Sequence, residues 1–157
     1  MPTPLPWVYP YLPEREVRRG QTPLRPVVPV SLVAQTSVPA QFALVDSGAE
    51  HTLAASWLAD EIGIDIAATD DHLELGIGGQ VVEAHFVEVT LLLRPSIGAT
   101  DFIEWRTDVG FIPGWRPLFS IILGQIGFFD RFTVTMHRGA AALAVEAWEA
   151  FDERFGV

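Results

Sequence analysis

Apolar and polar residues alternate along much of the chain, and this pattern predicts β-structure. The longest example is "QVVEAHFVEVTLLL" (80–93), where apolar residues stand at every second position from Val87 onward. A period of two places these side chains on one face of a strand. Gly78 and Gly79 separate this run from "HLELGI" (72–77), so the two runs predict a long β-hairpin.

Two further apolar runs precede it. "RPVVPVSLVA" (25–34) is rich in valine, and Pro26 and Pro29 predict a strand at a sheet edge or at a bulge, because proline cannot donate to a strand ladder. "QTSVPA" (35–40) is a predicted turn. "QFALV" (41–45) is a predicted buried strand that leads directly into an acidic residue.

The segment "SWLADEIGI" has the clearest helical pattern in the chain. Ser56 suits the N-cap, because its hydroxyl can accept a hydrogen bond from a backbone N–H of the first turn. Trp57, Leu58 and Ile62 share one face at helical spacing, and Gly63 suits the position after the helix end. We therefore expect one short helix here.

The last third of the chain again favours strands. "PLFSIILG" (117–124) predicts an apolar strand, "QIGFFDRF" (125–132) a short helix or turn, and "TVTMHRGAAALAVEA" (133–147) a hairpin. The tail "WEAFDERFGV" (148–157) predicts a short helix. The pattern of "AALAVEAWEAF" (141–151) is equally compatible with one longer helix.

Eight of the twelve prolines fall among the first 29 residues. Proline fixes φ and removes a backbone donor, so residues 1–24 are predicted to form an extended, irregular N-terminal arm. The arm also carries large apolar side chains, which are unsuited to a solvated tail. We therefore expect it to pack over the domain or over a second subunit. These apolar residues are Trp7, Tyr9, Tyr11 and Leu12.

The length of 157 residues suits one domain with a sizeable core, and a hydrophobic content of 49% excludes wholesale disorder. The predicted organisation is the arm (1–24), one all-β domain (25–147) and a helical C-terminal tail (148–157). The stretch 94–117 is expected to be a long loop, and the sequence assigns no function to it.

A formal net charge of −10 argues against nucleic acid and anionic membranes as partners, because no basic face is available. Cysteine is absent, which excludes disulfides and zinc–sulfur sites. The N-terminus lacks the basic and apolar regions of a signal peptide, and no apolar run reaches the roughly 18–20 residues of a membrane span. The expected location is the cytoplasm.

The stretch "ALVDSGAEHTL" (43–53) places Asp46 at the end of a predicted buried strand, on a turn with Ser47 and Gly48. Aspartic proteases require a carboxylate in this setting. Two such carboxylates share a proton, since two like charges in contact cannot both ionise, and together they activate a water. The hydroxyl residue braces the turn, and the glycine lets the backbone and the water approach closely.

Three motifs in order make the chain similar to the retropepsin-like, or retroviral-type, aspartic proteases over about residues 26–147. "LVDSGAEHTL" matches the apolar-apolar-Asp-Thr/Ser-Gly-Ala motif of this family and its following Thr. "GIGG" (76–79) lies in a hairpin where the family has its flap. "SIILG" (120–124) matches the strand that passes behind the catalytic turn, and "FFDRFTVTM" (128–136) resembles the closing helix of the family.

The resemblance implies roles for individual residues. Asp46 of each subunit would hold the lytic water, Ser47 would form a hydrogen bond across the dimer axis, and Gly48 would offer its carbonyl to the substrate backbone. Ala49 and Glu50 would bind substrate, with Glu50 accepting a substrate N–H. These roles assign the catalytic and substrate-binding residues of one protomer.

The resemblance also places Gly78 and Gly79 at the tip of a flap, where glycine permits the movement of a lid over the substrate. Two departures stand out. Gln125 follows Gly124 where many relatives have an Arg or Asp that ties the helix to the dimer interface. His51 stands where retroviral members often have a second acid, which implies a different substrate preference.

The chain contains one Asp-Ser/Thr-Gly motif, whereas pepsin-type proteins carry two lobes and are about twice as long. The second carboxylate must then come from a second copy of the chain. The implied fold is an all-β, single-lobe closed barrel with a short helix and a β-hairpin flap, functional as a homodimer. The implied activity is an endopeptidase acting on extended peptides or proteins, with no cofactor and no metal.

Two other functions are compatible with the same residues. A non-catalytic dimeric module could hold an extended peptide by β-augmentation in the same groove, or act as a scaffold. A metal-dependent hydrolase would use Asp46, Glu50 and His51. A dinucleotide site at 76–79 is excluded, because that motif requires a helix after the glycines and here a strand follows.

Overall fold

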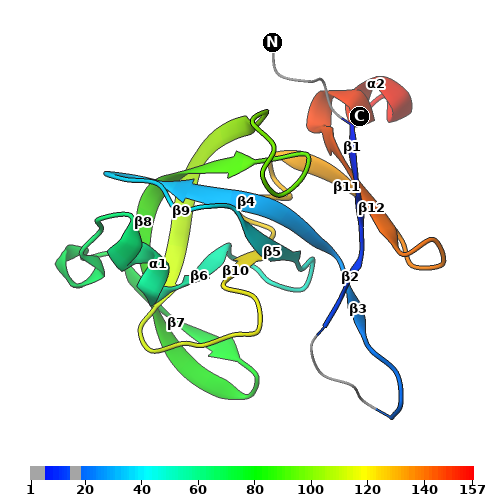
Figure 1. Cartoon of the computed structure of the whole chain (residues 1–157). Coiled ribbons are helices and arrows are strands. Elements are labelled where there is room, and N and C mark those ends of the chain that lie inside the picture. The colour runs from blue at the N-terminus through cyan, green and yellow to red at the C-terminus, as the bar shows by residue number, and fades with distance from the viewer. Residues whose placement is uncertain (1–5, 15–18) are drawn as a thin grey trace.

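The computed structural model describes residues 6–14 and 19–157 (Figure 1). Most of the regular structure in these residues is β-strand, and the predicted all-β fold class is confirmed. Twelve strands, two α-helices and one 3-10 turn follow one another along the described chain. None of the helices in this part of the chain is long and apolar enough to cross a membrane.

A closed barrel forms the centre of the molecule. Each of its strands pairs with the next, and β4 pairs back with β8 to complete the ring. Closure leaves the ring without a free edge between its first and last strands. In order around the ring, the strands are β4 (Val27–Val33), β5 (Gln41–Val45), β10 (Ile121–Leu123), β6 (Leu53–Ala55), β9 (Ile103–Ile112) and β8 (Gln80–Leu93).

The predicted hairpin consists of β7 (His72–Ile77) and β8, with Ile77 opposite Gln80. Gly78 and Gly79 form its two-residue turn, with φ of +57° and +80°. A tight hairpin of this kind requires positive φ at both turn residues, which glycine adopts without strain. The hairpin projects from the barrel as a two-stranded ribbon (Figure 1).

Strand β8 contributes to the core from alternate faces along its length. Beyond the hairpin, Val89, Leu91 and Leu93 are buried in the main core, as the alternation predicted. Closer to the hairpin tip, Ala84 and Phe86 belong to a second, smaller cluster on the opposite face. The same strand therefore anchors the barrel and supports the underside of the hairpin.

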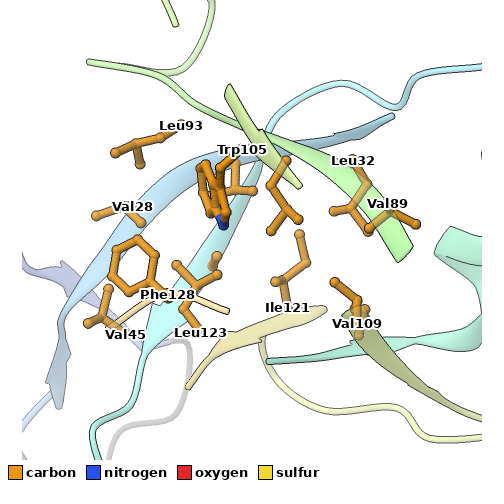
Figure 2. Close-up of a cluster of buried hydrophobic side chains, with 14 of the residues drawn as sticks. Val28, Leu32, Val45, Val89, Leu93, Trp105, Val109, Ile121, Leu123 and Phe128 are labelled. Carbon is orange, nitrogen blue, oxygen red and sulfur yellow. The ribbon is translucent and has the colours of Figure 1, made fainter. Parts of the chain in front are cut away.

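The main core fills the barrel and extends to one side of it (Figure 2). Trp105 of β9 lies at its centre, and its ring contacts Phe128 and Phe132 edge-on or tilted. The Trp105 Nε1 donates a hydrogen bond of 2.7 Å to the Gly127 carbonyl oxygen, so its one polar group is satisfied. This contact ties β9 to the segment that follows β10.

The part of the arm that the structure describes is more regular than predicted. Strand β1 (Trp7–Pro10) pairs with β12 (Ala142–Ala147), which pairs in turn with β11 (Phe132–His137), so three strands form a second sheet. Trp7 and Tyr9 are buried in the main core. Their alternation with exposed residues is a strand signal that the prolines obscured.

Strand β4 is not the edge or bulged strand predicted from its prolines. Val27–Val30 pairs with β5 on one side, and Val30–Val33 pairs with β8 on the other. The carbonyl of Pro29 accepts a hydrogen bond from Arg94 N, beyond the end of β8. The N–H and C=O of one strand residue point the same way, so the missing donor of Pro29 faces away from β5.

The predicted short helix is present as α1 (Ser56–Glu61), and Gly63 follows it with φ of +80°. Two details of the prediction were wrong. Ser56 is the first helical residue, because the chain enters the helix directly from β6 and Ala55 occupies the N-cap. Trp57 is exposed, so of the three predicted residues only Leu58 and Ile62 face the core, together with Ala59.

Three other predictions require correction or refinement. Residues 94–117 are not one loop, because they contain β9, the ten-residue strand between β8 and β6. The closing helix implied for 128–136 is absent, and a turn leads into β11 there. A strand, β12, and a separate helix, α2 (Trp148–Phe155), occupy the segment that was also compatible with one longer helix.

Tyr9 links the N-terminal strand to the barrel. Its hydroxyl donates a hydrogen bond of 2.8 Å to the Arg94 carbonyl, just beyond β8. Burial raises the pKa of Tyr9 above its ordinary value, because the phenolate would lose its hydration. The folded state therefore holds the phenol proton more tightly than the unfolded chain does.

The Tyr9→Phe variant is expected to lower the free energy of unfolding at neutral pH by about 0.5–1.5 kcal/mol, because the Arg94 carbonyl loses its partner. The raised pKa of Tyr9 makes a second contribution to stability, and this one depends on pH. It leaves stability intact below the unfolded pKa of about 10 and removes it progressively above that pH. Urea unfolding of both proteins at neutral pH and at about pH 11 measures the two effects.

The Tyr11→Phe variant is the matched control, since Tyr11 is the other tyrosine and is also buried. We expect a smaller loss for Tyr11→Phe at neutral pH. An equal loss in the two variants, or an alkaline decline that Tyr9→Phe retains in full, would contradict the role given to Tyr9.

Candidate active site

Asp46 directly follows β5 and begins a tight turn. The Asp46 Oδ1 accepts a hydrogen bond of 2.9 Å from Gly48 N, and the Asp46 carbonyl accepts one of 3.1 Å from Ala49 N. Among the described residues, no other hydrogen bond to the Asp46 carboxyl is recorded, so Oδ2 is available to a ligand. The side chain is half-buried. The turn thus holds one carboxylate oxygen and leaves the other for chemistry.

The segment after β10 holds this turn from behind. Asp46 N donates to the Leu123 carbonyl (3.0 Å), Gln125 N donates to the Ala49 carbonyl (2.9 Å), and Ile126 N donates to the Glu50 carbonyl (2.8 Å). Gly124 lies between these contacts, and a side chain there would meet the main-chain oxygens of His51 and Ala49. Only glycine therefore fits this crossing.

Thr52 closes the same crossing from the other side. Its Oγ1 donates to the Ile126 carbonyl (2.9 Å) and accepts from Gly124 N (3.2 Å). The residue is almost fully buried, and the bond from Gly124 N is buried as well, so this contact is protected from water. The sequence motif contained this Thr but gave it no role. The sequence signal for this role was the position of Thr52, after the glycine turn and directly before the buried strand β6.

Gln125 is a second residue whose role the sequence analysis missed. Its Nε2 donates a hydrogen bond of 2.7 Å to the Ser47 carbonyl, which belongs to the Asp46 turn. The sequence analysis singled out Gln125 only as a departure from the Arg or Asp of many relatives. In this chain the residue holds the turn within one protomer.

A cleft of about 390 Å³ lies between the Asp46 turn and the β7–β8 hairpin. Leu75 and Ile77 line it from the hairpin, and Ile122 lines it from β10. Of the seven predicted site residues, the structure brings five to this cleft: Asp46, Gly48, Ala49, Glu50 and Gly78. His51 also lines it, with its ring 5.1 Å from that of Phe86.

The other two predicted site residues lie outside the residues that line this cleft. Ser47 is exposed on the turn, and its carbonyl is held by Gln125. Gly79 is exposed at the hairpin tip, next to Gly78. The hydroxyl of Ser47 and the backbone of Gly79 are thus open to contact with another molecule.

A second cavity, of about 400 Å³, adjoins Asp46 from another direction and is also lined by Glu14. Glu14 is buried, and its Oε2 accepts a hydrogen bond of 2.7 Å from Arg25 Nε. Arg25 thus already occupies the Glu14 carboxyl, so Glu14 does not suit the proton-sharing partner that Asp46 would need. The described residues of one protomer supply no carboxyl bonded to Asp46.

A metal-dependent hydrolase would need Asp46, Glu50 and His51 to bind a metal ion. In the described ranges, 6–14 and 19–157, no three His, Asp or Glu side chains are grouped closely enough to hold a metal ion. The residues of the cleft therefore do not form a ligand set as they stand.

No family model and no curated protein matches the chain. Among solved structures, it is similar to a retropepsin-like aspartic protease from Rickettsia conorii, with 17% identity, coverage of 92% of this chain and 96% of that chain, and a TM-score of 0.48. It is also similar to the retroviral protease-like domain of Ddi1 from Leishmania major, with 16% identity, coverage of 78% and 93%, and a TM-score of 0.46.

The Gly124→Ala variant tests the crossing behind the turn. The added methyl group would collide with main-chain oxygens, so the Asp46 turn must shift. We expect the free energy of unfolding to fall by about 1–3 kcal/mol. Thermal unfolding measures the loss, and amide NMR shifts of residues 46–52 report the displacement.

The Gly76→Ala variant is the control, because a Cβ at Gly76 meets open space. Its stability is expected to stay within about 0.5 kcal/mol of the wild type. If Gly124→Ala were as stable as Gly76→Ala, the crossing would not constrain the turn.

Proposed function

We propose that the protein is an aspartic endopeptidase that acts as a homodimer. In this proposal, the Asp46 carboxyls of two protomers share a proton and activate a water that attacks a peptide bond. One carboxyl accepts the proton of the water, and the other donates its proton to the carbonyl oxygen. The reaction involves no covalent intermediate with the protein.

The observation that carries the proposal is the setting of Asp46. Its carboxylate is held at Oδ1 by Gly48 N, and it faces a cleft roofed by a glycine-tipped hairpin. A rigid turn suits catalysis, because a carboxyl fixed before the substrate arrives needs no reorganisation during the reaction. A hairpin lid suits it as well, because closure excludes water.

The need for a second protomer follows from proton sharing. Like-charged carboxyls in contact titrate as a pair, with one acid and one base at the same pH. Glu14 is a buried carboxyl that lines the same cavity as Asp46, and Arg25 already occupies it. A twofold axis next to Asp46 would supply the missing carboxyl from an identical chain.

The remaining site residues take their proposed roles from their positions. Ser47 is exposed on the turn, where its hydroxyl can cross the axis to the partner. Gly48 and Ala49 line the cleft, where the Gly48 carbonyl can accept from the backbone of an extended peptide, and Glu50 offers an acceptor for a substrate N–H. Gly78 and Gly79 form the lid tip, where the backbone can approach the substrate closely.

The Asp46→Asn variant is expected to fold and dimerise normally but to lose at least about a thousandfold in turnover, because an amide cannot share the proton. Cleavage is followed by mass spectrometry on a peptide library from acidic to neutral pH, with a statin-type inhibitor as a control. Sedimentation measures the dimer in both proteins.

The outcomes separate the proposal from its rival. Undiminished cleavage by Asp46→Asn would end the proposal. Binding of library peptides without any cut product would favour the non-catalytic peptide-binding module. Loss of cleavage on adding a chelator would instead point to a metal-dependent hydrolase.

The pH dependence of kcat/KM is expected to be bell-shaped. Activity falls at low pH, where both Asp46 carboxyls are protonated, and at higher pH, where both are ionised. A rate that rises with pH to a plateau would indicate a single base and would contradict the paired mechanism.

A further inference from the structure

A second cavity adjoins the one beside Asp46, and neither of the two is lined by residues of the β7–β8 hairpin. The 400 Å³ cavity that Asp46 lines shares Glu14, Leu118 and Phe119 with a neighbouring cavity of about 540 Å³. The shared residues place the two cavities side by side. We call this second cavity the distal groove, and it is lined by Leu12, Pro13, Glu14, Gln41, Phe42, Leu118, Phe119 and Ser120.

The wall of the distal groove comes from the N-terminal arm. Strand β2 (Leu12–Pro13) pairs with β3 (Leu24–Arg25), and Glu14 N donates to the Pro23 carbonyl (2.7 Å). The buried Glu14 carboxylate accepts from Arg25 Nε across this pair. Removing Arg25 would leave the buried Glu14 carboxylate without a partner, so the ion pair helps to fix the position of the wall.

The distal groove combines large apolar side chains with the polar residues Glu14, Gln41 and Ser120. Phe42 is 41% exposed and Leu118 is 53% exposed, which is unusual for large apolar side chains that share one concave surface. Phe119 and Pro13 add further apolar area. A large apolar side chain placed here would release water from both surfaces.

We propose that the distal groove is a specificity site of the proposed peptidase, which binds a large apolar side chain of the substrate some distance from the scissile bond. The inference rests on the proposed function. Its occupant is the flanking part of the substrate polypeptide, because the groove adjoins the cavity that Asp46 lines and shares three lining residues with it. The substrate class is therefore a long, extended peptide with a bulky apolar residue in one flank.

The arrangement gives the arm a function in recognition. Binding energy gained in the distal groove lies away from the reacting bond, so it can hold the substrate in register for attack. Short peptides that end near the scissile bond would lack this contact. Cleavage is therefore expected to depend on peptide length and on the flank, as well as on the residues at the cut.

The test uses two pools of synthetic peptides with the same randomised centre. One pool has flanks of Gly and Ser, and the other has one Phe or Leu in each flank at varied distances from the centre. Cleavage by the wild type is measured by mass spectrometry. Binding to Asp46→Asn is measured by fluorescence anisotropy of the labelled pools. The apolar-flanked pool is expected to be preferred about tenfold or more in both assays.

Two substitutions locate the preference. Phe42→Ser removes apolar area from the distal groove alone, and it is expected to reduce the preference to near unity. Ile97→Ser is the matched control, since Ile97 is 47% exposed but lies outside the groove. It is expected to keep the full preference. Circular dichroism confirms that each variant is folded.

The outcomes distinguish the inference from the proposed function. Cleavage without any flank preference, or a preference that Phe42→Ser retains, would overturn the inference and leave the peptidase proposal standing. A flank preference in binding to Asp46→Asn, lost in the Phe42→Ser background, supports the groove even if the wild type cuts no peptide. Absence of both cleavage and flank-dependent binding would overturn the two together.

Discussion

The crossing of two chain segments behind Asp46 is the constraint on which the candidate site depends. Main-chain bonds from Leu123, Gln125 and Ile126 hold the turn, and Gly124 is the point where no side chain fits. Thr52 joins the two segments of the crossing with two side-chain hydrogen bonds. A carboxylate so fixed can meet a substrate without rearrangement, which is what makes the turn suitable for catalysis.

The rest of the fold supports this crossing. Trp105 holds the Gly127 carbonyl from the core, so the packing of β9 reaches the segment behind the turn. Strand β8 buries one face in the barrel and supports the hairpin over the cleft with the other. The N-terminal arm is held to the rest of the chain by the Tyr9 hydrogen bond to Arg94 and by the Glu14–Arg25 ion pair. Stability and the proposed recognition thus draw on the same contacts.

The sequence predicted those features that local patterns determine. The hairpin of 72–93 follows from period-two alternation around two glycines, and α1 follows from helical spacing and Gly63. Features set by long-range pairing were missed. Strand β9 was missed because Arg106 and Asp108 interrupt its apolar run. Pro29 suggested an edge strand because proline lacks a backbone donor, and the sequence does not reveal that Arg94, distant along the chain, bonds to the Pro29 carbonyl. The roles of Thr52 and Gln125 arise only from the crossing itself.

The most direct test of paired Asp46 carboxyls is the activity of mixed dimers. Equal amounts of the wild type and Asp46→Asn are mixed, allowed to exchange protomers, and assayed against a peptide that the wild type cleaves. If each site needs an Asp46 from both copies, the mixture has about a quarter of the activity of the same total amount of wild type. Retention of about half, as expected when each protomer carries its own complete site, would contradict the account.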